Sequence, residues 1–376
     1  MRLFASELLS RADTFIIGAG SDGRSWNPLI FFSMPGEKMA TAAFINQDPH
    51  IVPLEEANIA GLESLFDEQC EEWLALLDWD YTYPSRLIRK VARERDLTGF
   101  AAVAGGAIVG FAFYVVEEGR CSIGDMYVSK PWRGRGVDRR LLEAILDELA
   151  LVPRLRRIES QCVAIGNEAA NDLLEASGFE RFERHYMLID LAQVRAAARV
   201  ENTLDGTYST GRVAEGRDLS AVSIKNWEEP DFEAAARIIY ESYRGEYDSR
   251  INSQYASLEG CAELLSVLIE HVWCGEFLPQ VSRVAVSSRG KRVGVLIASR
   301  IADGIGHISQ ISILPDYQGR GIGRRMIDEA LLRFNGCGFK RVSLAVTATN
   351  ANAFHLYQSC GFRTKHSFPV FYRERR

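Results

Sequence analysis

An internal repeat constrains this chain more than any other feature of its sequence. The first copy runs over 126–142 and the second over 311–327, and both pass from an apolar strand through a Gly-Arg-Gly loop into an amphipathic helix. A second match follows in the same order, at 167–179 and 350–362, where each copy begins with Asn and ends with Gly-Phe. Two matches in one order indicate a duplicated domain.

Each copy has the same expected order of elements. Helical periodicity predicts an opening rich in helices, at roughly 54–96 and 231–272. Apolar strands joined by short turns follow, and then the motif strand, the loop, a helix, a further strand and a short helix. We therefore predict an α/β fold made of two tandem domains. The expected segments are an extension without regular structure over 1–46, a first domain over 47–194, a linker over 195–217 and a second domain over 218–376.

Composition excludes several classes of protein. The chain has 376 residues and a net charge of −6, which disfavours a general nucleic-acid binder. It lacks a run of about 18 apolar residues, so we expect no membrane span. Seven cysteines form no CxxC pair and six histidines show no ligand spacing, so we expect reduced thiols, no metal and a cytoplasmic location.

The glycine-rich loop of the second copy carries the most chemical information. A strand that leads through Gln318–Gly323 into a helix exposes backbone amides at the helix start, where they bind phosphate oxygens. Arg320, Arg324 and Arg325 add positive charge. The alternative is a plain strand-to-helix turn with a solvated basic helix. The spacing differs from that of a Walker loop and of a dinucleotide fingerprint.

The order strand, Gln/Arg-x-x-Gly-x-Gly, helix, strand, Asn-x-x-Ala-x-x-Leu-Tyr-x-x-x-Gly-Phe resembles the GCN5-related N-acetyltransferase (GNAT) superfamily. The resemblance covers roughly 47–190 and 218–374, and the duplication resembles tandem-domain members such as mycothiol synthase. It implies a mixed, mostly antiparallel sheet flanked by helices, in which two parallel strands splay apart around acetyl-CoA.

The resemblance also implies which residues hold the cofactor. The motif strand is expected to pair with pantetheine and to place an oxyanion donor near its end, and the loop amides are expected to bind the pyrophosphate. Asn350 matches a position that contacts the cofactor arm, although it can equally cap its helix. The implied cofactor-binding residues are Ile311, Ser312, Ile313, Gln318, Gly319, Arg320, Gly321, Ile322, Gly323, Arg324 and Asn350.

Two residues match catalytic positions of the superfamily. Tyr357 matches the tyrosine that protonates the departing thiolate, and its alternative is a buried tyrosine of the core. His307 lies where many members carry a glutamate base, and a histidine suits the removal of a proton from an amine. Its alternative is a strand histidine that only satisfies its hydrogen bonds.

The first copy has lost these features. Asp138 replaces Gly323, where a carboxylate is expected to cap its own helix and repel a pyrophosphate. Leu174 replaces Tyr357, and Ser122 replaces His307. We therefore expect the first copy to be a degenerate domain that supports or regulates the second, and that helps to shape the acceptor site.

The expected function is transfer of an acetyl group from acetyl-CoA to a primary amine of a small molecule or peptide, catalysed by the second domain. A non-catalytic acyl-CoA sensor and a scaffold protein are the alternatives. The acceptor is expected near 240–250, where Glu241, Glu246 and Asp248 attract a cation, with Asn252 and Tyr255 beyond. A solvated helix face is the alternative there.

Overall fold

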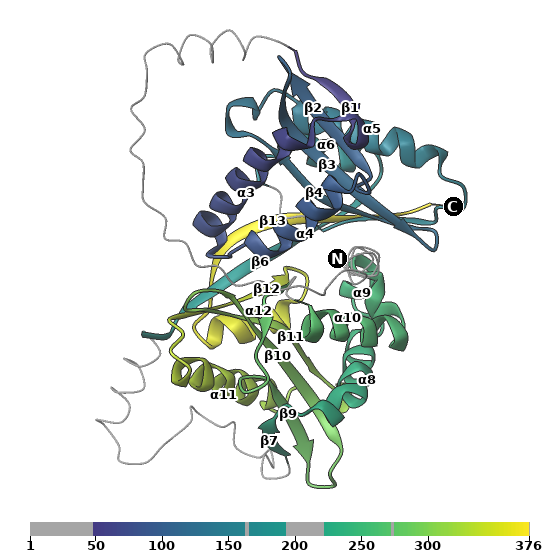
Figure 1. The fold of residues 1–376 in the computed structure, drawn as a ribbon. Coiled ribbons are helices and arrows are strands. Elements are labelled where there is room, and N and C mark those ends of the chain that lie inside the picture. The colour runs from purple at the N-terminus through teal and green to yellow at the C-terminus, as the bar shows by residue number, and fades with distance from the viewer. Residues whose placement is uncertain (1–47, 162–164, 193–221, 272–273, 376) are drawn as a thin grey trace, which may run out of the picture.

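The protein is described from a computed structural model that covers residues 48–161, 165–192, 222–271 and 274–375. The expected extension over 1–46 and the expected linker over 195–217 lie outside the described residues. Figure 1 shows two halves with strands and flanking helices, joined by long strands that run from one half into the other.

The N-terminal half has the predicted order of elements. Its two opening helices precede a strand meander, and the motif strand β4 leads through the first glycine loop into α5. The elements are β1 (His50–Pro53), α3 (Leu62–Leu77), α4 (Thr82–Arg93), β2 (Gly99–Ala104), β3 (Ala107–Glu117), β4 (Arg120–Val128), α5 (Val137–Leu151), β5 (Arg157–Ser160), α6 (Glu168–Ala176) and β6 (Glu180–Asp190).

The C-terminal half repeats this order. Its opening helices again precede a meander, and the motif strand β11 leads through the second glycine loop into α11. The elements are β7 (Val222–Asn226), α8 (Phe232–Tyr243), α9 (Asp248–Ile251), the 3-10 helix η6 (Ser253–Ala256), α10 (Leu258–Glu270), β8 (Glu276–Phe277), β9 (Arg283–Ser287), β10 (Arg292–Ala302), β11 (Ile305–Ile313), α11 (Ile322–Gly336), β12 (Arg341–Thr347), α12 (Ala351–Ser359) and β13 (Arg363–Glu374).

The two halves share one sheet because they exchange their last strands. The strand order is β1-β2-β3-β4-β5-β13-β6-β12-β11-β10-β9-β7. Thus β13, the last strand of the chain, pairs with β5 of the N-terminal half, and β6 pairs with β12 of the C-terminal half. Figure 1 shows β13 (yellow) running into the upper half. The predicted mixed sheet is confirmed, since among the described strands only β4–β5 and β11–β12 are parallel pairs.

The exchanged strands also fill the core of the half that they enter. Met187 and Ile189 of β6 are buried among the side chains of the C-terminal half. Phe371 of β13 is 1% exposed and packs among residues of β3, β4 and α5 in the N-terminal half. Each half therefore depends on the other for part of its apolar core.

Replacing Phe371 with Ala should lower the free energy of unfolding by about 3–5 kcal/mol, because it removes a buried ring and leaves a cavity. Chemical denaturation measures this loss. Hydrogen exchange should also become faster at β5, the strand that pairs with β13. Leu332→Ala is the control, since Leu332 is 67% exposed. Unchanged exchange at β5 would contradict the dependence of the N-terminal half on this strand.

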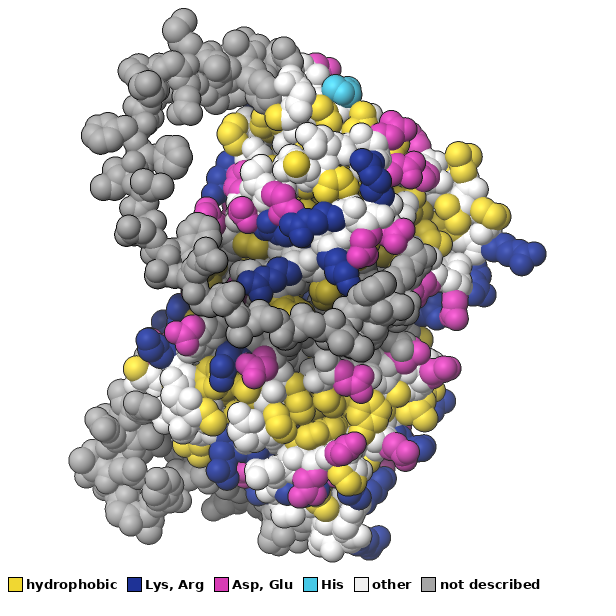
Figure 2. All heavy atoms as spheres, in the orientation of Figure 1, with side chains coloured by type: hydrophobic (Ala, Val, Ile, Leu, Met, Phe, Trp, Pro, Cys, Tyr) yellow, Lys and Arg dark blue, Asp and Glu magenta, His cyan; other side chains and the backbone are white. Residues whose placement is uncertain are grey.

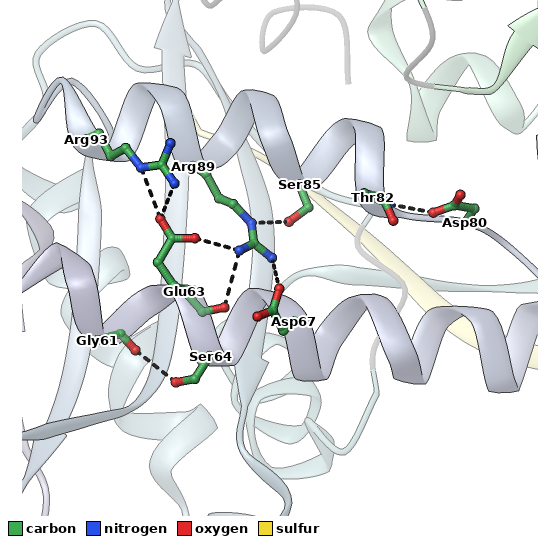
Figure 3. A network of polar contacts seen from close by, with 9 residues as sticks. All are labelled: Gly61, Glu63, Ser64, Asp67, Asp80, Thr82, Ser85, Arg89 and Arg93. Carbon is green, nitrogen blue, oxygen red and sulfur yellow. Dashed lines mark hydrogen bonds and ion pairs between the residues drawn. The ribbon is translucent and has the colours of Figure 1, made fainter. Parts of the chain in front are cut away.

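Ion pairs hold α3 and α4 of the N-terminal half together. The Arg89 guanidinium on α4 contacts Glu63 at 2.6 Å and Asp67 at 2.7 Å, both on α3 (Figure 3). Arg93 contacts the second oxygen of Glu63 at 2.5 Å. These pairs fix the two helices that cover one face of β3 and β4.

Neither the described helices nor the face drawn in Figure 2 indicates a membrane span or one dominant charge. Within the described ranges, every helix is too short or too polar to cross a membrane. On the face in Figure 2, Lys and Arg are mixed with Asp and Glu over both halves.

Candidate active site

The parallel strands β11 and β12 separate part-way along their length. They pair from Ile305 with Arg341 to Ile308 with Leu344, and no further. Beyond that point β11 continues beside β10 to Ile313, while β12 continues beside β6 to Thr347. The two strands therefore follow different neighbours, and backbone groups on their facing edges lose strand partners.

A bulge in β11 accompanies this separation. Ile297 of β10 pairs with Gln310, but the next residue, Ala298, pairs with Ile308, so Ser309 is an extra residue of β11. A bulge re-aims the side chains around it. The N-terminal half has a bulge at the corresponding place, since the register between β3 and β4 shifts between Ala112 and Tyr114.

The glycine loop lies at the end of the separated strand. Gly319 and Gly321 have φ angles of 66° and 79°, which glycine adopts without strain. The next residue, Ile322, begins α11, whose start has no side-chain cap. The first amides of α11 therefore have no acceptor within the helix and lie at the positive end of its dipole. This is a ready site for a phosphate group.

Side chains around the loop hold it in shape. The Ile313 carbonyl accepts hydrogen bonds from Gln318 Nε2 and Ser242 Oγ, both at 2.9 Å. Arg320 donates to the Asp316 carbonyl at 2.7 Å, and Arg324 donates to Asp328 and to the Ser359 carbonyl. The loop is thus fixed by contacts within the C-terminal half.

Gly323 occupies a tight position on α11. A Cβ atom at this residue would lie 3.2 Å from Ile313 Cδ1 and 3.3 Å from Leu356 Cδ2. Next to it, Asn350 Oδ1 accepts a hydrogen bond from the Ala353 amide at 3.1 Å and so caps α12. Asn350 therefore acts as a helix cap, which was the alternative to contact with the cofactor arm.

In the first copy, different side-chain contacts join the loop helix to the short helix that follows β5. Asp138 is buried, and its Oδ2 accepts a hydrogen bond from the Ala170 amide of α6 at 2.9 Å. The expectation that Asp138 caps its own helix is therefore wrong, because its carboxylate caps the neighbouring helix α6. Asn167, the counterpart of Asn350, donates instead to the Met126 carbonyl at 3.1 Å.

Tyr357 lies on α12 and is 7% exposed. Burial raises the pKa of its hydroxyl, and the negative charge of Asp248 raises it further. A phenol of this kind stays protonated and keeps its proton available.

Polar side chains gather on the face of β11 that packs against α8. Gln310, at the bulge, donates to Tyr243 Oη at 3.2 Å and to Ser312 Oγ at 2.9 Å. The Tyr255 hydroxyl donates to Gln310 Oε1 at 3.2 Å. The rings of Tyr243 and Tyr255 stack with centroids 3.9 Å apart, and burial raises the pKa of Tyr243 to about 12. The sequence indicated Tyr255 but not Gln310.

The N-terminal half carries a carboxylate at the corresponding bulge. Asp125 accepts hydrogen bonds from Tyr81 Oη at 2.5 Å and Gln69 Nε2 at 3.2 Å. Burial raises the pKa of this carboxyl. Equal spacing from the two glycine loops is the sequence signal that would have found Asp125 and Gln310.

A charged pair borders the polar side chains. Asp248 Oδ1 accepts a hydrogen bond from Thr347 Oγ1 at 2.5 Å, and Arg184 Nη2 lies 3.9 Å from the same oxygen. Arg184 comes from β6 of the N-terminal half. Of the acidic residues expected to face an acceptor, Asp248 is mostly buried here, whereas Glu246 is exposed.

His307 lies away from this cluster, where β11 and β12 are still paired. It is 6% exposed, its Nδ1 lies 2.9 Å from Ser343 Oγ, and its ring packs against Trp79 and Tyr186. Burial lowers its pKa to about 3. The geometry favours the alternative of a strand histidine that satisfies its hydrogen bonds between the two halves.

Replacing His307 with Gln should leave turnover within a few-fold of the parent, since loss of a general base lowers rates by about 10²–10⁴. The free energy of unfolding of this variant should also fall less in acid than that of the parent protein. The unfolded chain protonates this histidine near pH 6.5 and the folded chain does not, so the group costs about 1.4 kcal/mol per pH unit below that value. Denaturation at pH 4 to 7 measures this slope. A hundredfold loss of turnover would restore His307 as the base.

Comparison with known proteins identifies the family. The sequence description of the Acetyltransferase (GNAT) family matches residues 62–179 and 225–362, which is more than half of the chain. The protein belongs to the GNAT acetyltransferase family. Both halves match it, which agrees with the duplication seen in the sequence. Among the described residues, no group of three His, Cys, Asp or Glu side chains could hold a metal ion.

The curated relatives include three mycothiol acetyltransferases. That of Saccharopolyspora erythraea is 25% identical over 69% of this chain and 80% of the relative. Those of Propionibacterium freudenreichii and Geodermatophilus obscurus are 30% and 35% identical, over 15% and 20% of this chain. The latter two alignments span 18% and 24% of the relatives' own lengths.

Solved structures share the fold. A GCN5-related N-acetyltransferase from Sphaerobacter thermophilus has a TM-score of 0.53 at 19% identity, covering 76% of this chain and 84% of that chain. A tandem GNAT protein from the clavulanic acid biosynthesis pathway has a TM-score of 0.50 at 16% identity, covering 87% and 98%. The tandem GNAT architecture is thereby confirmed.

Proposed function

We propose that the protein transfers an acetyl group from acetyl-CoA to a primary amine, and that its C-terminal half performs the reaction. One observation carries this proposal. Only the C-terminal half combines Gly323 in the first turn of its loop helix with a buried tyrosine, Tyr357, on the short helix that follows β12.

The binding groups of this half fit a thioester carrier with a diphosphate. The free amides at the start of α11 would bind the diphosphate, and the backbone of Ile311–Ile313 would pair with the extended arm. A backbone donor near the end of β11 would stabilise the oxyanion. Bound acetyl-CoA supplies the acetyl group as a thioester.

Tyr357 would hold the proton that the departing thiolate needs. A phenol has an ordinary pKa of about 10, above that of a thiol. Because burial and Asp248 raise the pKa of Tyr357, its hydroxyl remains protonated at neutral pH. Asp248 would also attract the cationic amine of the acceptor, and the lowered pKa of His307 leaves that histidine neutral.

We also propose that the N-terminal half, over 47–194, supports the second domain, over 218–376, rather than acting on its own. Asp138 replaces Gly323 in the first turn of the loop helix, and Leu174 replaces Tyr357. The exchanged strands favour a supporting role for the N-terminal half, since each half completes the core of the other.

Thiol release from acetyl-CoA, measured with a panel of primary amines, tests the proposed function. We expect release that depends on the amine and that mass spectrometry matches to an acetylated product. Calorimetry with acetyl-CoA separates the alternatives. Binding without turnover would indicate a sensor, and no binding at millimolar acetyl-CoA would indicate a scaffold.

A further inference from the structure

We infer that the acceptor amine carries a carboxylate, and that Arg184 of the exchanged strand β6 binds it. This inference rests on the proposed acetyl transfer and names the class of acceptor. Arg184 is the Cα partner of Thr347 across the β6–β12 pair, so both side chains lie on the same face of the sheet. Thr347 bonds to Asp248 of α9 on that face.

The guanidinium of Arg184 has donors to spare. It has five N–H groups, and it makes one hydrogen bond among the described residues, from Nη1 to Gln161 Oε1 at 3.2 Å. Its contact with Asp248 at 3.9 Å is too long for a hydrogen bond, and that oxygen already accepts from Thr347. Its side chain is only 20% exposed.

Arg184 is linked through Asp248 to the polar side chains on β11, because α9 leads into η6 and Tyr255 of η6 bonds to Gln310. The positive charge of Arg184 acts on the hydroxyls of Tyr243 and Tyr255, and opposes the rise that burial causes in their pKa. Those two hydroxyls bond to Gln310 at the bulge of β11. A ligand held by Arg184 would therefore lie beside α9 and η6, whose Tyr255 bonds to Gln310.

The N-terminal half also fixes α9, which carries Asp248, and the adjacent η6. Its strand β5 and the residues beside it bind the backbone or side chains of α9 and η6. Gln161 contacts both Arg184 and the Ile251 carbonyl at the end of α9. The contacts are Arg157 to the Arg250 carbonyl, Gln161 Nε2 to the Ile251 carbonyl at 3.2 Å, the Ser253 amide to Glu159 Oε1 at 3.2 Å and Arg120 Nη1 to Ser253 Oγ at 3.1 Å.

A partly buried guanidinium with free donors in a fixed frame suits a planar anion. Arginine binds a carboxylate through two parallel hydrogen bonds, which adds geometric specificity to the charge. Asp248 beside it offers a carboxylate to the ammonium group of the same molecule. Amino acids and short peptides with a free carboxylate have this combination of charges.

Matched pairs of acceptors test the inference directly. Amino acids and dipeptides are compared with their carboxamides, which keep the amine and lose the charge. We expect kcat/KM for the carboxylates to exceed that for the carboxamides by about 10- to 100-fold, as for a site built to bond a charged group. Equal values for both members of each pair would overturn the inference.

Arg184→Met should remove this preference. It should lower kcat/KM for the carboxylates by about 10- to 100-fold and leave the carboxamides and the KM for acetyl-CoA nearly unchanged. Arg184→Lys, which keeps the charge without the fork, should recover part of the loss. Arg181→Met on the same strand is the control, since Arg181 bonds to Glu175 and Glu183 instead. A preference that survives in Arg184→Met would contradict the assignment.

Binding separates this inference from the proposed function. If no amine is acetylated, the proposed function fails, but calorimetry with the same pairs still decides the role of Arg184. Tighter binding of the carboxylate, lost in Arg184→Met and partly kept in Arg184→Lys, supports it. Equal binding of both members by the parent protein contradicts it.

Discussion

Replacing Tyr357 with Phe should lower kcat by about 100- to 1,000-fold, which is the scale of a lost general acid. The phenyl ring fills the same buried space, so the KM for acetyl-CoA should change by no more than a few-fold. The departing thiolate then has no protonated phenol beside it. Thiol release at saturating acetyl-CoA and amine measures the effect.

Two controls give the Tyr357 result its meaning. Tyr372→Phe removes a hydroxyl that bonds to Glu180 in the N-terminal half, and should leave kcat unchanged. Single-turnover kinetics establish whether chemistry limits the rate. Equal rates for Tyr357→Phe and the parent, with chemistry limiting in both, would remove Tyr357 as the acid.

Replacing Gly323 with Asp should weaken acetyl-CoA binding by about 100-fold or more, which corresponds to roughly 3 kcal/mol. The new carboxylate would lie at the start of α11 and would repel a diphosphate at the helix amides. It could not repeat the bond of Asp138, because Asn350 already occupies the Ala353 amide. Calorimetry with acetyl-CoA measures the dissociation constant.

Gly323→Asn is the matched control for this change, since it has the same shape without the charge. Both variants place a Cβ atom near Ile313 Cδ1 and Leu356 Cδ2, so both carry the same crowding. The difference between their affinities therefore reports the electrostatic part. An unchanged affinity in Gly323→Asp would discredit the proposed diphosphate site and the account of Asp138.

Local patterns in the sequence determined the elements of this fold. Period-2 and helical spacing marked the strands and helices, and the repeated Gly-Arg-Gly loops marked the junctions of β4 with α5 and of β11 with α11. The resemblance to the GNAT superfamily implied the mixed sheet with its separating parallel strands. These features are local because turn chemistry and side-chain periodicity act between residues that are close in sequence.

Contacts between distant residues were decided only by the tertiary structure. The sequence of β6 is compatible with either β5 or β12 as its hydrogen-bonded neighbour, because strand pairing uses backbone groups that every residue has. The exchange of β6 and β13 therefore left no local signal, although it brings Arg184 beside Asp248 and encloses His307 between Trp79 and Tyr186. Apolar burial in both halves selects this one arrangement, and it is set by the whole molecule rather than by any one segment.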